Sequence, residues 1–267
     1  MKKEIDKQLD RIAKKESKIL NKEESKLFKN KLEPAIDKIQ GKIPEKLNDL
    51  LETAFLKGFK LVFEKGHIVI DKTYNKDKLK MGYAYNNSEI NKKMSGWRMR
   101  KLDKQSRQSQ RVNSLISAVE GGILGVLGIG LPDIPLFISF IFRDINEIAY
   151  SYGYNPEKES EKEYILLLIC GAVSKEQRQK TFNEKIDLFG RNIDQNLQNE
   201  ISLDEQMKET AKILSESMLA AKFIQGIPIV GVIGGVVNYS LIKRIGEYSS
   251  LKYKKRYLNR KKTTVHR

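Results

Sequence analysis

The sequence predicts an all-α protein, a helical bundle around two glycine-rich apolar helices with an extra charged helix at its N-terminus. Three observations support this. Apolar residues recur at spacings of three and four along several segments, which is the period of an amphipathic helix. Two long stretches, 115–142 and 223–242, contain almost no charge. The single strand-like stretch, 67–70, has no second strand to pair with, so we expect no sheet.

Residues 1–31 predict a highly charged amphipathic helix with a narrow apolar stripe. Its apolar residues fall at spacings of three, four and seven: Ile5, Leu9, Ile12, Ile19, Leu20 and Leu27. We assign 1–31 to this N-terminal helix and 32–267 to the main helical domain. Two interpretations stay open. The helix either rests on the body of the protein with a solvated outer face, or it contacts a second copy or another partner.

The spacing of the apolar residues in 45–63 predicts the next helix, and Gly58 weakens its end. The segment 72–111 that follows is the most basic in the chain, with twelve cations against three acids. Three of its cations, Arg98, Arg100 and Lys101, lie beside the only tryptophan. Basic residues mixed with aromatic ones are typical of an anionic membrane interface or of a single-strand nucleic-acid surface. A solvated loop that packs its aromatic side chains on the core is the third interpretation.

The two apolar runs are rich in glycine and proline. The run 223–242 has no charged residue over twenty positions, the usual length of a membrane-spanning helix. Glycine is also frequent where helices approach closely. The runs are therefore either packed core helices with glycine contact faces, or an amphitropic hairpin that inserts into a bilayer.

The remaining segments continue the helical pattern. Residues 159–173 predict an apolar helix that holds the only cysteine, Cys170, as a small core residue. Residues 175–222 predict one or two amphipathic helices. The tail 243–267 carries ten cations against one acid. Such a tail is attracted to an anionic leaflet by about 1 kcal/mol per basic group near the surface. We expect that role for three consecutive cations, Lys254, Lys255 and Arg256.

Net charge, targeting signals and cysteine content limit the partners and the cell compartment that we expect for the protein. Lys and Arg total 50 against 34 Asp and Glu, a net charge of +16, which favours an anionic membrane surface or nucleic acid as partner. The first sixty residues lack the apolar segment of a secretory signal, so we expect a cytoplasmic protein. One cysteine excludes a disulfide framework within the chain, which agrees with a reducing compartment.

The stretch 131–154 carries the most specific polar pattern. Asp133 is suited to cap a helix start, and Pro135 is tolerated in the first turn. Arg143 and Glu147 then fall on one polar stripe of an otherwise apolar helix, four residues apart. The stripe either faces solvent or forms a buried polar network with the glycine-rich runs.

These motifs, taken in order, resemble the EcsC family over roughly residues 40–258. The Asp133-Ile-Pro135 step, Arg143, Glu147 and a Tyr152-Gly-Tyr-Asn155 turn carry the resemblance. It also rests on a later group: Pro228-Ile-Val-Gly231, Asn238 and Arg256-Tyr-Leu258. The resemblance implies a cytoplasmic, mainly α protein named for an operon that also encodes an ABC transporter, and it implies no established reaction.

The resemblance adds residues to the candidate site. The candidate polar network consists of Asp133, Arg143, Glu147 and Asn238. The turn and packing residues that the family pattern marks are Pro135, Tyr152, Gly153, Pro228 and Gly231. The pattern does not separate structural from functional roles for these residues.

Enzyme signatures are mostly absent from the sequence. Only two histidines occur, His67 and His266, and there is no phosphate-binding GxxxxGK[ST] loop. We therefore expect no metal site and no cofactor. The leading prediction is a non-enzymatic accessory protein at the inner face of the membrane that binds anionic lipid or a membrane protein. The alternatives are a lipid-modifying or hydrolytic enzyme that uses Asp133, Arg143 and Glu147, and a nucleic-acid-binding protein.

Overall fold

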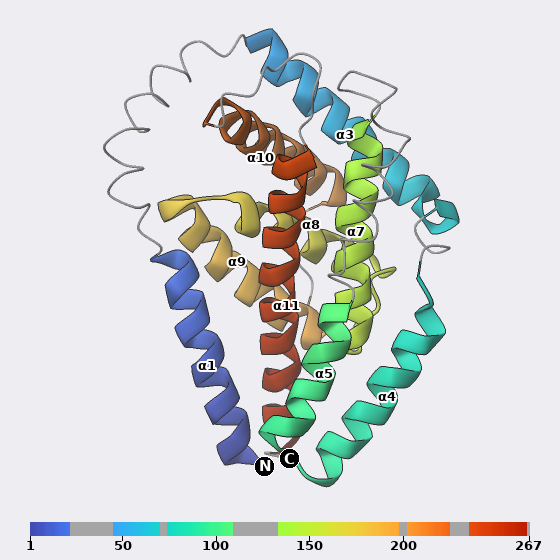
Figure 1. Cartoon of the computed structure of the whole chain (residues 1–267), viewed down its shortest axis with the longest axis vertical. Coiled ribbons are helices and arrows are strands. Elements are labelled where there is room, and N and C mark those ends of the chain that lie inside the picture. Colours follow the sequence, from blue (N-terminus) through green and yellow to red (C-terminus); the bar gives the residue numbers. More distant parts are fainter. Residues whose placement is uncertain (22–44, 70–73, 109–132, 198–201, 225–234, 266–267) are drawn as a thin grey trace.

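The computed structural model describes residues 1–21, 45–69, 74–108, 133–197, 202–224 and 235–265. In chain order its helices are α1 (Lys2–Leu20), α3 (Glu45–Val69), α4 (Lys76–Lys92), α5 (Gly96–Gln108), α7 (Asp133–Ser151), α8 (Glu159–Val173), α9 (Glu176–Asp194), α10 (Leu203–Ile224) and α11 (Gly235–Val265). No strand occurs within these ranges, which confirms the all-α prediction. Figure 1 shows α11 as a long helix through the middle of the molecule, with α1 and α5 beside its lower half.

The core is built around α8. Every residue from Tyr164 to Val173 is buried, and α8 packs against α9, α10 and α11. A helix that is apolar on all sides needs neighbours on all sides, which is why the apolar run of α8 lies in the core. Cys170 lies within this run, and its thiol donates to Thr210 Oγ1 at 3.3 Å. Burial raises the pKa of the Cys170 thiol to about 12, so the residue is an unreactive part of the core, as predicted.

The helices α3 and α7 meet at a glycine. A Cβ at Gly58 would lie 2.5 Å from Ile138 Cδ1, so this glycine permits a close approach and does not end the helix. Phe59 and Phe142 pack edge to face near it, with ring centroids 6.0 Å apart. The helix continues to Val69 and includes the first residues of the strand-like stretch. α3 therefore extends beyond the predicted end at residue 63.

The basic segment folds as a helical hairpin, α4 and α5, and not as a solvated loop. Asn75 caps α4 by accepting the Lys78 backbone N–H at 2.8 Å. Gln105 on α5 accepts from Asn86 Nδ2 at 2.9 Å and donates to the Leu79 carbonyl at 2.9 Å, so it joins the two helices. The hairpin packs on α7. Its helices are mostly polar around their circumference, so no amphipathic pattern predicts them.

The N-terminal helix α1 rests on the body of the protein. Its buried residues fall at spacings of three and four: Ile5, Gln8, Ile12 and Glu16. They face α11 and α9. This contact agrees with the interpretation in which the N-terminal helix rests on the body of the protein with a solvated outer face. Two polar side chains, Gln8 and Glu16, lie inside the contact.

The glycine-rich parts of the two apolar runs, 115–132 and 225–234, lie outside the described residues. The rest of these runs forms the first turns of α7 and α11 and the last residues of α10. Among the helices that the structure describes, none combines the length and the apolar character that a membrane span requires. The central packing of the glycine-rich runs and their insertion into a bilayer therefore remain predictions.

Candidate functional site

The candidate polar network is described in part. Arg143 Nε donates to Glu147 Oε1 at 3.0 Å, with Glu147 buried and Arg143 half-buried on α7. The side chains of Asp133 and Asn238 lie outside the described residues, so the structure joins only two of the four members. The enzyme alternative, which requires Asp133, Arg143 and Glu147 to converge, stays a prediction.

A neighbouring carboxylate, Asp144, was missed by the sequence reasoning. It is 4% exposed, and its Oδ1 has no hydrogen-bond partner. Burial and, second, the charge of Glu147 raise the pKa of Asp144 to about 7, against the opposing effect of Arg143. The available signal was its register: Ile141, Asp144 and Ile148 follow the apolar face of α7 at spacings of three and four.

Three of the five turn and packing residues marked by the family resemblance are described, and each has a structural contact. Tyr152 is buried, and its hydroxyl donates to Asp103 Oδ1 at 3.0 Å. Gly153 has a φ of +80°, and a Cβ there would collide with the ring of Tyr83. Pro135 accepts the Ser139 hydroxyl at its carbonyl, at 2.7 Å. Pro228 and Gly231 lie outside the described residues.

The tail cations Lys254, Lys255 and Arg256 do not form the free basic patch that we expected. Lys254 Nζ lies 2.7 Å from Asp103 Oδ2. Arg256 is 5% exposed and pairs with Glu161 and Asp194. The surface position expected for Arg256 is therefore wrong, because α11 crosses the bundle and turns this side chain toward acids of α8 and α9.

Arg256 lies in a cage of tyrosines. Its guanidinium carbon is 4.2 Å from the ring centroid of Tyr154 and 4.3 Å from that of Tyr164. Arginine combines bidentate pairing with stacking on aromatic rings, which lysine does not do. Its Nη1 and Nη2 atoms donate to the two oxygens of Glu161 at 3.1 and 2.8 Å. This site is closed and structural.

A second ion-pair cluster docks α1 onto the bundle. Lys252 and Lys255 of α11 each contact both Glu16 of α1 and Asp187 of α9, at 2.6 to 2.8 Å. Lys252 is 1% exposed. Burial alone would lower the pKa of Lys255, but its hydrogen bonds to Asp187 and Glu16 outweigh this and raise it. The four charges alternate in sign, so each cation has two acidic neighbours.

The three candidate cations of α5 differ among themselves. Arg98 pairs with Glu89 at 3.2 Å and donates to the Lys93 carbonyl at 2.7 Å. Lys101 is exposed, with its Nζ 3.9 Å from the ring centroid of Trp97. Arg100 is exposed and faces a cleft. Two of the three therefore remain at the surface, as predicted.

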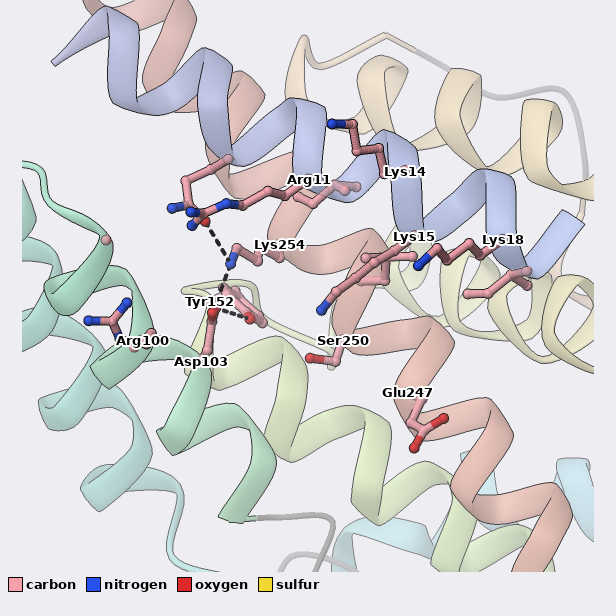
Figure 2. Close-up of a pocket in the computed structure, with 15 residues that line it drawn as sticks. Arg11, Lys14, Lys15, Lys18, Arg100, Asp103, Tyr152, Glu247, Ser250 and Lys254 are labelled. Atoms are coloured by element: carbon pink, nitrogen blue, oxygen red, sulfur yellow. Dashed lines mark hydrogen bonds and ion pairs between the residues drawn. The ribbon is translucent and has the colours of Figure 1, made fainter.

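This cleft, of about 750 Å³, lies between α1, α5, the end of α7 and the middle of α11, and we call it the basic cleft. Figure 2 shows the side chains that line it. Six of them are basic and two are acidic, which gives a net charge of +4: Arg11, Lys14, Lys15, Lys18, Arg100 and Lys254 against Asp103 and Glu247. Only Arg100 and Lys254 of this set were singled out from the sequence.

The floor of the basic cleft is an ordered polar network. Asp103 accepts from the Tyr152 hydroxyl and from Lys254, and Lys254 also donates to Gln8 Oε1 at 3.2 Å. Ser250 adds a hydroxyl, 3.1 Å from that of Ser106. Asp103 thus holds Lys254 in place and neutralises it.

The walls of the basic cleft are unneutralised. Arg11, Lys15 and Lys18 lie on one face of α1, at spacings of four and three, and Arg100 projects from α5. None of these four side chains forms an ion pair with another residue in the described part of the chain. In Figure 2, Lys15 extends from α1 toward Tyr152 and Ser250 at the floor. Concentrated, unpaired positive charge around a cleft attracts anions.

Within the described residues, no group of three or more His, Cys, Asp or Glu side chains could hold a metal ion.

The fold and the basic cleft define an all-α protein with a cationic recess between α1 and α11. The chain belongs to the EcsC protein family, which it matches over residues 6–258. That range starts within α1, whereas we expected residues 1–31 to lie outside the family region.

Among curated proteins, the chain is similar to the uncharacterized protein YdbA of Bacillus subtilis (strain 168). The two are 24% identical over 143 residues, which is 52% of each chain. The chain therefore spans about half the length of the curated relative it matches. No solved structure matches it.

Proposed function

We propose that the protein is a peripheral accessory protein at the cytoplasmic face of the membrane, and that it binds anionic lipid through exposed cations of α1 and α5. The observation that carries this proposal is the sorting of charge on α1. The helix holds seven basic and four acidic residues. Two of its four acids form ion pairs inside the protein, whereas none of its cations forms an ion pair to a described residue.

Two of the four acids of α1 pair with cations of α11. Asp6 pairs with Lys262 at 2.7 Å, and Glu16 pairs with both Lys252 and Lys255. Glu4 accepts from Gln8 at 2.9 Å. The ion pairs of Asp6 and Glu16 neutralise these two acids from the inside, so the outer face of α1 is more basic than its composition indicates.

The cations of α1 are exposed and make no ion pair to a described residue: Lys2, Lys3, Lys7, Arg11, Lys14, Lys15 and Lys18. Near an anionic leaflet each basic group contributes about 1 kcal/mol to binding. Several such groups on one helix are enough for reversible attachment without a lipid anchor.

Exposed aromatic side chains on the neighbouring hairpin support the same proposal. Trp97 is 56% exposed, Tyr85 is 64% exposed, and both border a shallow depression that also holds Lys101. Tryptophan and tyrosine favour the headgroup level of a bilayer, where an aromatic ring meets lipid and its polar edge meets water. Met81 is exposed on the same helix as Tyr85, one turn earlier.

Co-sedimentation with vesicles tests the proposal. The protein should bind phosphatidylserine vesicles at low salt, bind phosphatidylcholine vesicles weakly, and lose most binding at high salt. Reversing Lys7, Lys14 and Lys18 to Glu should weaken binding by at least about tenfold, because three attractive groups become repulsive. Equal binding by the variant and the wild type would reject the proposal.

A matched control carries the same charge change elsewhere. Lys57 and Lys60 on α3 and Lys212 on α10 are exposed, on helices at the opposite end of the bundle from α1 in Figure 1. Reversing these three should leave binding nearly unchanged. Retention on single-stranded nucleic acid without vesicle binding would instead favour the nucleic-acid alternative.

A further inference from the structure

We infer that the basic cleft is a binding site for a ligand that carries two phosphomonoester groups, such as a bisphosphorylated lipid headgroup. The inference rests on the proposed function, in which α1 faces an anionic membrane, and it names the chemical class that the cleft selects there. It differs from general attraction to a leaflet because it depends on the geometry of one recess.

The size and charge of the basic cleft fit this class. Its volume of about 750 Å³ falls within the range of ordinary ligand sites. Its net charge of +4 matches two phosphomonoesters, which together carry about −3 to −4 at pH 7. A single carboxylate or phosphodiester would leave most of that positive charge unneutralised.

The arrangement of the cations also fits. Arg11, Lys15 and Lys18 approach from α1, while Arg100 approaches from α5 on another wall. A ligand between them meets cations from two sides, whereas a flat leaflet meets only the outermost ones. Arginine provides paired N–H donors for phosphate oxygens, and lysine adds point charges that adjust to the ligand.

The floor supplies neutral donors and a fixed depth. The Ser250 hydroxyl lies at the bottom of the recess, near the network of Tyr152, Asp103 and Lys254. Because Lys254 is already paired with Asp103, it holds the floor together and the wall cations remain for the ligand. Glu247 lies at one end of the lining and repels negative charge there, which limits where phosphate groups can sit.

The test compares two double variants of the full-length protein on two vesicle types. Lys15→Gln with Lys18→Gln removes two wall cations, and Lys3→Gln with Lys7→Gln removes two cations of the same helix outside the basic cleft. One vesicle type contains phosphatidylinositol 4,5-bisphosphate, and the other contains enough phosphatidylserine to give the same surface charge. Circular dichroism checks that both variants keep the helical content of the wild type.

The expected result is a preference for the bisphosphate vesicles of about tenfold or more, the change expected from one or two charge-assisted contacts. The Lys15 and Lys18 variant should lose this preference, and the Lys3 and Lys7 variant should keep it. Arg100→Gln, from the other wall, should reduce it independently. Soluble inositol 1,4,5-trisphosphate should bind in calorimetry and should compete with the bisphosphate vesicles.

The remaining outcomes separate the two proposals. Equal binding to both vesicle types, weakened alike by both double variants, would overturn the basic-cleft inference and support the proposed function. Binding of the soluble headgroup that needs Lys15 and Lys18, without binding to either vesicle, would support the phosphate site and overturn the membrane proposal. Binding to none of these probes would overturn both.

Discussion

Two basic helices, α1 and α11, lie side by side in this protein, and their charges have opposite surroundings. Within α11, cations such as Lys252 and Arg256 are buried and face acids from three other helices. The cations of α1 are exposed and form no ion pair to a described residue, while two of its acids, Asp6 and Glu16, pair with α11. A basic segment can therefore be assigned to an anion-binding surface only when the acids that its cations pair with inside the protein are known.

The position of each helix in the bundle explains why the cations of α11 are paired and those of α1 are not. α11 crosses the middle of the bundle, where an unpaired charge would lose its hydration without compensation. α1 lies at the periphery and contacts the body along one narrow stripe. Cations on its outer face keep their hydration and need no partner, so they remain available to a ligand or a leaflet.

The largest effect should come from breaking the best-paired cation of α11. Arg256→Met keeps much of the side-chain volume but removes the cation that pairs with buried Glu161 and with Asp194. We expect a loss of about 3–5 kcal/mol in the free energy of unfolding, measured by urea denaturation. Lys18→Met on α1 should change it by less than about 0.5 kcal/mol. Similar losses for both variants would remove the distinction between the two helices.

Asp144 is a buried acid whose Oδ1 has no hydrogen-bond partner among the described residues. Replacing it should therefore stabilise the protein, whereas replacing the paired Arg256 should destabilise it. The pKa of Asp144 is about 7 in the folded protein, against 3.8 for an ordinary aspartate. Well below pH 3.8 both states hold the proton. As the pH rises from 4 to 7 only the unfolded state releases it, so the folded state loses stability over that window.

Asp144→Asn removes this cost. We expect the variant to be more stable than the wild type by about 2–4 kcal/mol at pH 8, and nearly equal to it at pH 4. Urea denaturation at the two pH values measures the difference. A loss of stability at pH 8 would mean that the ionised carboxylate of Asp144 is stabilised in the folded state and that burial does not raise its pKa.

The smallest of these effects should come from the contact between the two helices. Glu16→Gln weakens the cluster with Lys252 and Lys255, and we expect a loss of about 1–3 kcal/mol. Hydrogen exchange of the α1 amides should accelerate more than that of α8. Asp10→Asn, an exposed change on the same helix, serves as the control and should alter neither quantity. Equal exchange in the Glu16 variant and the wild type would show that apolar contacts alone hold α1.

The elements with strong local patterns were predictable. The bounds of α8 follow from its charge-rich start and its continuous apolar run, and the apolar stripe of α1 follows from Ile5 and Ile12. The hairpin of α4 and α5 was not predicted as helical, because its stability depends on contacts such as that of Gln105 with the Leu79 carbonyl. Gly58 was read as a weak point of a helix, whereas Ile138 of α7 makes it a contact point.

The sequence by itself determined that this protein is helical and basic, and which segments are most charged or most apolar, because these properties are local. Only the tertiary structure decided which cations are free. Lys255 pairs with Glu16 across 239 positions, and Lys254 pairs with Asp103 across 151. The electrostatic interaction depends on distance in space and on burial, and neither can be read from spacing along the chain. For the same reason, Arg11, Lys15 and Lys18 became a candidate site only when α1 was seen beside α5 and α11.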